Sequence, residues 1–145
     1  MVDYKKSLLL IGNFLSSKGM SQGVSKNLND LLTADGWHVL CASTYLNKSL
    51  RLLDMIVSAV KWQKRYQIAN IDVFSGRSFL WAEVMGSLFS MLDKDFVCTL
   101  HGGNLALFAK ENPNRVHRLL RKAARVVTPS NFLKNHFLEI RDDII

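Results

Sequence analysis

Residues 7–13 read SLLLIGN, an unbroken apolar run that stops at a glycine and an asparagine. The apolar residues do not alternate with polar ones, which is typical of a strand buried on both faces, as in a parallel sheet. A glycine-bearing loop over residues 14–22 follows. It leads into a helix expected over residues 23–34, with an Asp-Gly stop signal at residues 35–36. We therefore expect the chain to open with the strand, loop and helix of an α/β fold.

The alternation of strand and helix continues to the end of the chain. No two consecutive strands are joined by a hairpin-length turn, so we expect parallel strands linked by right-handed crossovers. The predicted fold class is α/β, a doubly wound, Rossmann-like parallel sheet in one domain over residues 1–145, with the common strand order 3-2-1-4-5. The expected strands are 7–11, 37–42, 71–74, 96–100 and 126–127, and the expected helices are 23–34, 50–66, 78–92, 112–124 and 130–138.

Composition and charge limit the class of protein. A chain of 145 residues with 48% hydrophobic and 21% charged residues is an ordinary globular domain, which excludes a disordered tail, a collagen-like fibre and a disulfide scaffold. The net charge of +7 favours an anionic partner, which could be nucleic acid, a phosphorylated ligand or an acidic membrane. Cys41 and Cys98 lie in apolar runs without metal-ligand spacing, so we expect reduced, buried thiols in a cytoplasmic protein and no metal site.

No segment of the chain is expected to span a bilayer. The longest apolar stretch, residues 79–92, contains Glu83 and is shorter than the roughly 20 residues that a spanning helix needs. The apolar run at residues 8–11 is too short for a signal peptide and lacks a cleavage site. The apolar pair Ile144-Ile145 that ends the chain predicts the opening of another strand, and with it a second domain that is absent from this chain.

Two glycine-marked loops indicate where a ligand would bind. Ligands of doubly wound sheets bind beyond the carboxyl ends of the strands, where the strand order reverses. With the order 3-2-1-4-5 this point lies between the first and fourth strands, which lead into residues 13–23 and 101–104. The first loop precedes a helix N-terminus, a favourable place for an anion, but it has neither a Walker nor a GxGxxG pattern. Its alternative role is a plain turn. The candidate substrate-binding residues in these loops are Gly19, Ser21, Gln22, Gly23, Gly102, Gly103 and Asn104.

His101 is the main candidate for a chemical role. It ends an apolar strand and precedes two glycines, so its ring is expected to face an open cleft, where it can hydrogen-bond a hydroxyl or phosphate. A purely structural histidine is the alternative. The other three histidines, His38, His117 and His136, lack such a setting and are interpreted as packing or surface residues. No Ser-His-Asp or paired-carboxylate pattern supports a hydrolase.

The helix expected over residues 50–66 is amphipathic and basic. We expect its apolar face, which includes Leu53, Val57 and Val60, to pack on the sheet, with a solvated basic face opposite. The alternative is contact with an anionic membrane, with the tryptophan at headgroup level. A second basic cluster at residues 115–125 supports this alternative, whereas the lack of interleaved aromatics disfavours a nucleic-acid platform. The membrane-contact residues under this hypothesis are Arg51, Lys61, Trp62, Lys64 and Arg65.

Five motifs in order resemble one enzyme family over essentially the whole chain. They are GMSQG at 19–23, DGWHV at 35–39, IDVFS at 71–75, TLHGG at 99–103 and ARVVTPS at 124–130. This pattern is similar to the N-terminal half of the retaining GT-B glycosyltransferases of family 4. The resemblance implies that this half binds the acceptor, and that the donor-binding half is absent here. It also implies that His101 contacts the transferring sugar, that residues 19–23 line the acceptor or diphosphate side, and that Ser75 and Ser130 line the cleft.

The function expected from this resemblance is the acceptor-binding half of a hexosyltransferase. The whole enzyme would transfer a sugar from a nucleotide-sugar to a glycan or lipid-linked acceptor in polysaccharide biosynthesis, and this chain alone would be inactive. Its expected partners are that acceptor, the nucleotide-sugar through the missing half, and an anionic membrane. It is expected to be cytoplasmic, at the inner face of the plasma membrane, without a cofactor or metal. A stand-alone Rossmann-like or flavodoxin-like binding module is the alternative, and a nucleic-acid-binding domain is a third.

Overall fold

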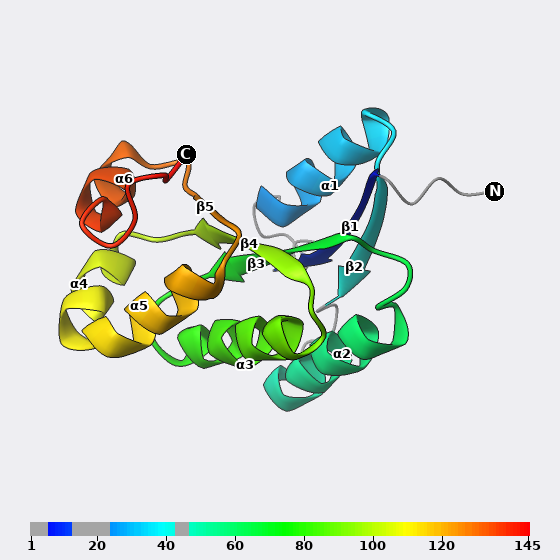
Figure 1. Ribbon diagram of the computed structural model, residues 1–145, viewed down its shortest axis with the longest axis horizontal. Helices are drawn as coiled ribbons and strands as arrows, with labels where there is room; N and C mark the ends of the chain where they lie inside the picture. Colours follow the sequence, from blue (N-terminus) through cyan, green and yellow to red (C-terminus); the bar gives the residue numbers. More distant parts are fainter. Residues whose placement is uncertain (1–5, 13–23, 43–46) are drawn as a thin grey trace. The chain divides into compact units, whose positions relative to one another are not determined.

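The computed structural model describes residues 6–12, 24–42 and 47–145 and shows an α/β fold (Figure 1). Five parallel strands form one sheet in the order β2-β1-β3-β4-β5, flanked by helices, which confirms the predicted fold class. The elements are β1 (Ser7–Ile11), α1 (Val24–Ala34), β2 (His38–Ala42), α2 (Lys48–Lys61), β3 (Ile68–Val73), α3 (Arg77–Met91), β4 (Asp95–Leu100), α4 (Asn104–Glu111), α5 (Pro113–Lys122), β5 (Arg125–Val127) and α6 (Asn131–Phe137).

The strand order corrects one expectation. In the order 3-2-1-4-5 the first and fourth strands are neighbours, but here β1 lies between β2 and β3, and β4 lies between β3 and β5. The order therefore reverses between β1 and β3. Both orders satisfy the same alternation of strands and crossover helices, so the sequence pattern does not distinguish them.

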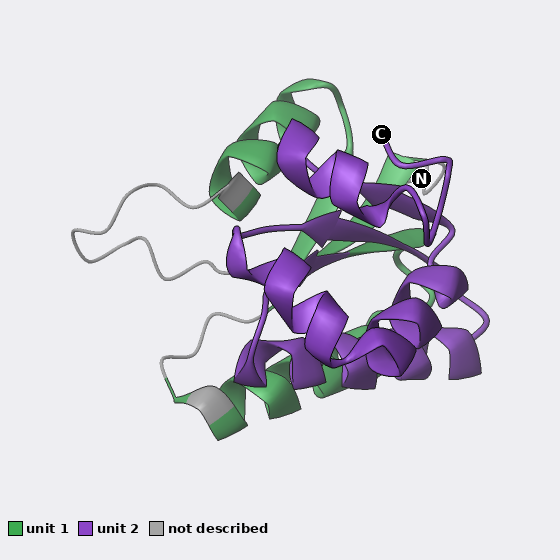
Figure 2. Cartoon of the chain, turned by 90° about the vertical axis from the view of Figure 1, so that its left-hand side faces the viewer, with its two compact units in different colours: residues 1–70 green, residues 71–145 purple. Residues whose placement is uncertain are grey.

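The chain divides into two compact units, residues 1–70 and residues 71–145 (Figure 2). In the first unit, β1 pairs with β2 in parallel, from Ser7 opposite His38 to Ile11 opposite Ala42. Every residue of β1 is buried, as its continuous apolar run predicts. Helices α1 and α2 lie on opposite sides of this strand pair (Figure 1). The predicted site residues Gly19, Ser21, Gln22 and Gly23 lie outside the described residues.

Helix α2 differs from its prediction in both length and orientation. It begins after Asn47, whose side-chain oxygen accepts hydrogen bonds from two backbone N–H groups of the first turn. It ends at Lys61, five residues before the predicted Tyr66, whose buried hydroxyl donates back to the Ala59 carbonyl over 3.0 Å. The expectation that Leu53, Val57 and Val60 pack on the sheet is wrong, because all three are exposed. The buried residues of α2 are Arg51, Met55, Ser58 and Ala59.

This orientation has a physical reason. Three of the four buried positions are spaced four residues apart along one line of the helix, and the small side chains of Ser58 and Ala59 allow close backbone approach. Arg51 is buried along with them, and burial lowers the pKa of its guanidinium below the ordinary value.

In the second unit, α3 and α5 lie on one side of the strands and α6 on the other (Figure 1). The sequence at 78–92 is apolar nearly all round, which predicts a buried helix, but only one face of α3 is buried, and Leu80 and Met91 are exposed. That face is Phe79, Ala82, Met85, Gly86 and Phe89. The segment after β4 contains α4, which the sequence analysis missed, before α5 begins with its proline at the first turn, as predicted.

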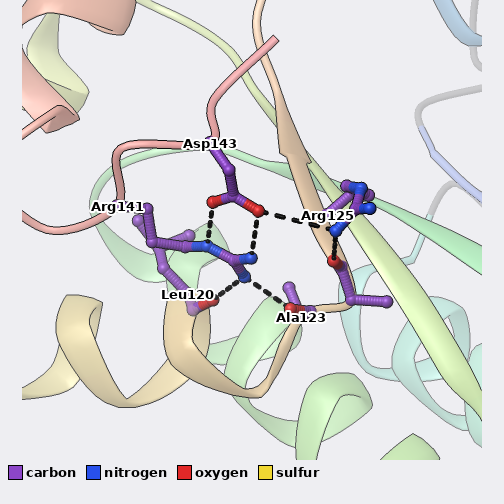
Figure 3. A network of polar contacts seen from close by, with 6 residues as sticks. Leu120, Ala123, Arg125, Arg141 and Asp143 are labelled. Atoms are coloured by element: carbon purple, nitrogen blue, oxygen red, sulfur yellow. Dashed lines mark hydrogen bonds and ion pairs between the residues drawn. The ribbon is translucent and has the colours of Figure 1, made fainter.

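The last residues of the chain dock on this unit. Arg141 donates two hydrogen bonds to carbonyls at the end of α5, those of Leu120 and Ala123, and it forms a bidentate pair with Asp143 (Figure 3). This pairing raises the pKa of Arg141 and lowers that of Asp143. Beyond it, the Ile145 N–H donates to the Val126 carbonyl, and the Ile145 carbonyl accepts from the Thr128 N–H. The final residue therefore makes the two hydrogen bonds along β5 that a residue of a parallel strand makes.

Candidate functional site

The carboxyl ends of β3 and β4 bring a carboxylate and an imidazole together. Asp72 lies near the end of β3, and His101 follows the last residue of β4. The backbone N–H of His101 donates to the Val73 carbonyl over 3.0 Å, which extends the pairing of the two strands by one step. The His101 Nε2 then lies 3.2 Å from the Asp72 Oδ1. Only 9% of the His101 side chain and 6% of the Asp72 side chain are exposed.

An aromatic ring fixes the other side of the imidazole. Phe74 stacks on His101 with 5.0 Å between ring centroids and an interplanar angle of 18°. A carboxylate accepts hydrogen bonds, so Nε2 is the nitrogen that carries the proton in the pair with Asp72. The neutral imidazole then has Nδ1 as its acceptor. The ring is thus held in one plane and one tautomer, as a histidine that must orient a ligand needs to be.

The turn after His101 is open. Gly102 has a φ of 83°, a left-handed conformation that side-chain-bearing residues seldom adopt. A Cβ added at Gly102 or Gly103 would meet no heavy atom within 4 Å, so the space beside both residues is unfilled. Asn104 then begins α4. A ligand can therefore approach the backbone next to the imidazole.

The end of β5 lies at the same edge of the sheet. β5 pairs with β4 in parallel, with Thr99 opposite Val127. The Thr128 hydroxyl donates to the Leu100 carbonyl over 3.2 Å and accepts from the Ser130 N–H, so it joins the two strand ends. The Ser130 hydroxyl accepts from the Leu133 N–H and caps α6, at the start of the helix expected over residues 130–138. Ser130 therefore has a structural role here beside its predicted role in the cleft.

We call Asp72, Phe74, His101, Gly102 and Gly103 the His101 site. Three of these residues were predicted to bind or react, and the sequence analysis missed Asp72 and Phe74. A signal for Asp72 existed: it is an acidic residue within an apolar strand, where an unpaired charge would be costly. The predicted Ser75 follows Phe74 directly and is half-buried.

Two expectations about His101 are corrected by its surroundings. The residue follows β4, whose neighbours are β3 and β5, so it does not border the reversal of strand order between β1 and β3. Its ring was expected to face an open cleft, but the side chain is nearly buried. The cause in both cases is the position of β3, which lies next to β4: Asp72 in β3 and Phe74 just after it cover the ring.

A second polar cluster lies between α3 and α5. Arg115 donates to Glu83, with its Nε 3.0 Å from Oε1, and its guanidinium lies over the rings of Phe79 and Phe108. Hydrogen bonding to Glu83 raises the pKa of Arg115. A small cavity of about 70 Å³ adjoins this pair. Part of the predicted basic cluster at 115–125 is thus engaged in holding α3 against α5.

The described residues contain neither a metal-binding cluster nor a membrane-spanning helix. Within residues 6–12, 24–42 and 47–145, no group of three or more His, Cys, Asp or Glu side chains is arranged to hold a metal ion. Over the same residues, none of the helices has the length and apolarity needed to cross a bilayer.

The chain matches no protein-family model, and it matches no curated protein either. The resemblance to family 4 glycosyltransferases therefore depends on the sequence motifs alone, and the function must be argued from the residues of the site.

Proposed function

We propose that this chain is the acceptor-binding half of a glycosyltransferase, and that the His101 site contacts hydroxyls of the acceptor sugar, whereas the family resemblance assigns His101 to the transferring sugar. The observation that carries the proposal is the Asp72–His101 pair, at 3.2 Å, beside an unfilled glycine turn at the carboxyl end of a parallel sheet. Ligands of such sheets bind at this end of the strands. The motifs IDVFS at 71–75 and TLHGG at 99–103, which carry the family resemblance, are the segments that supply this pair.

The chemistry of the pair suits a hydroxyl-rich ligand. With Nε2–H donating to Asp72, Nδ1 can accept a hydrogen bond from a sugar hydroxyl. The stacked Phe74 ring is about one third exposed and offers an apolar face beside it. These groups would orient a sugar at the junction with a donor-binding half, which the family resemblance places outside this chain.

The test is calorimetric titration of the chain with two ligand sets. One set is neutral saccharides and isoprenoid-linked sugars as acceptors, and the other is UDP- and GDP-sugars as donors. We expect binding from the acceptor set and none in the micromolar range from the donor set. In His101→Gln, acceptor affinity should fall about tenfold or more, because the amide can keep the contact with Asp72 but offers no ring nitrogen. His117→Ala, at a half-buried position on α5, is the matched control.

Two outcomes would contradict the proposal. The first is micromolar affinity for a nucleotide-sugar, since this chain would then bind the donor and not the acceptor. The second is equal acceptor affinity in wild type and His101→Gln, since the imidazole would then have no role in binding.

A stand-alone binding module is the second candidate, and one observation favours it. The order β2-β1-β3-β4-β5 is the order of flavodoxin-like folds, which bind their ligand where the strand order reverses. Titration with flavin mononucleotide tests it. Tight binding that is unaffected by His101→Gln would favour this candidate over the transferase.

A further inference from the structure

An apolar line of side chains runs along the outward face of α2. Leu50, Leu53, Val57 and Val60 are each between 42% and 56% exposed. Their spacing of three, four and three residues places them on one face of the helix. The opposite face of the helix, which includes Arg51, is buried. Helix α2 therefore presents these aliphatic residues to solvent. We call these four residues the α2 stripe.

The charges around the α2 stripe are positive. Lys61 at the end of the helix is exposed, as are Lys64 and Arg65 in the turn that follows. Trp62, at the helix C-cap between them, is half-buried. The one acidic residue in the α2 sequence is Asp54, which is half-buried and lies 3.5 Å from the Ser58 hydroxyl. The outward face of α2 is therefore aliphatic along its length and cationic at its carboxyl end.

We propose that α2 docks on the surface of an anionic bilayer, with the α2 stripe in the acyl boundary and Lys61, Lys64 and Arg65 on the headgroups. An aliphatic face bordered by exposed cations has the charge and apolarity that such a surface requires. The helix is too short to span, so the contact is peripheral. Arg51 was one of the expected contact residues, but its side chain is buried and cannot contact the bilayer. This proposal does not depend on the transferase proposal, since the His101 site lies in other residues.

The experiment is co-sedimentation of the whole chain with vesicles of phosphatidylcholine mixed with phosphatidylglycerol, and with pure phosphatidylcholine vesicles. We expect stronger binding to the mixed vesicles. The variant Leu53→Ser/Val57→Ser should weaken it about tenfold or more, because two exposed aliphatic side chains no longer enter the bilayer. Lys61→Glu/Lys64→Glu/Arg65→Glu should abolish the preference for the anionic lipid. Leu80→Ser/Met91→Ser, which removes two exposed apolar residues of α3, is the matched control and should bind as wild type does.

Circular dichroism establishes that each variant is folded, and all altered positions are exposed, so folding should be retained. The proposal is overturned if the wild type pellets with neither vesicle, or if the α2 stripe variant pellets as the wild type does. It is also overturned if equilibrium sedimentation without lipid shows a dimer that Leu53→Ser/Val57→Ser dissociates, because a second copy would then cover this face.

Discussion

A nearly buried histidine with a carboxylate at one ring edge and a phenyl ring against its face has little freedom to rotate. The two partners of His101, Asp72 in β3 and Phe74 just after it, lie 29 and 27 residues earlier in the chain. The cost of ordering the ring is therefore met during folding, and a ligand that bonds to Nδ1 meets a fixed acceptor. The proposed binding role rests on this preorganisation.

The Asp72–His101 contact should also contribute to stability. In Asp72→Ala the imidazole keeps its burial but loses its acceptor, so we expect the free energy of unfolding to fall by about 1–3 kcal/mol. Asp72→Asn has nearly the same shape, and its amide oxygen can accept the same hydrogen bond, so it should lose less than half as much. Urea denaturation of the three proteins measures this. If both variants lost the same free energy of unfolding, the hydrogen bond to His101 would not be the way in which Asp72 stabilises the fold.

At this scale the sequence indicated the centre of the site but not its surroundings. His101 could be predicted because its signal is local: an apolar strand, a histidine and two glycines in succession. Asp72 and Phe74 could not be assigned to it, because their contact depends on β3 and β4 being neighbours. The capping role of Ser130 could be predicted, since the capped N–H lies three residues away in the same chain segment.

At the scale of the element, helix positions were easier to predict than helix faces. The sequence of α2 shows its aliphatic residues clearly, but the expectation that aliphatic residues face the sheet failed. Burial of Arg51, Met55, Ser58 and Ala59 decides the orientation, and three of those side chains are polar or small. The short α4 was missed because glycines and an asparagine at its start read as a loop.

The packing of α3 against α5 depends on a glycine. A Cβ at Gly86 would lie 2.7 Å from Leu119 Cδ1 and 3.3 Å from the Phe96 ring. Alanine favours a helix by about 1 kcal/mol over glycine, but overpacking costs about 1–3 kcal/mol. Because the cost of overpacking exceeds the gain in helix propensity, we expect Gly86→Ala to lower the free energy of unfolding by about 1 kcal/mol.

Chemical denaturation provides the measurement for Gly86→Ala, with Ser87→Ala at an exposed position of the same helix as the control. In the background Leu119→Ala, where the clashing methyl group is removed, Gly86→Ala should become neutral or stabilising. A stabilised Gly86→Ala in the native background would mean that Leu119 has room to move, contrary to this account of the packing.

At the scale of the whole molecule, the fold class could be predicted because strand and helix periods recur along the entire chain. The strand order could not, since crossovers of similar length serve both the expected and the observed order. In the observed order the reversal lies between β1 and β3, so the position of the reversal no longer argues for a ligand at His101. The argument for the site is the Asp72–His101 pair beside the open glycine turn.

Two buried acidic side chains, Cys98 and Tyr66, and the half-buried Cys41 should make the folded chain sensitive to alkali. Burial raises the pKa of Cys98 to about 12 and that of Cys41 to about 11, both from 9.0, and it raises that of Tyr66 to about 12 from 10.0. The folded state then holds protons that the unfolded chain releases, so stability is fully present below 9.0 and falls as the pH rises above it.

Urea midpoints at about pH 8 and about pH 10.5 measure this loss. Cys98→Ala should show a smaller decrease between the two pH values, because one of the three groups is gone. A midpoint that stays constant or rises over this range in the wild type would contradict the raised pKa values of these three side chains.

The central claim is that a sugar acceptor binds at the His101 site, and amide chemical shifts test it most directly. The ¹⁵N-labelled chain would be titrated with the acceptor saccharide that binds it best. We predict that the largest shift changes fall on Ser75, Gly102, Gly103 and Asn104, and that His101→Gln removes them. Changes confined to the residues after β1, with 101–104 unaffected, or no changes with any saccharide, would contradict the account.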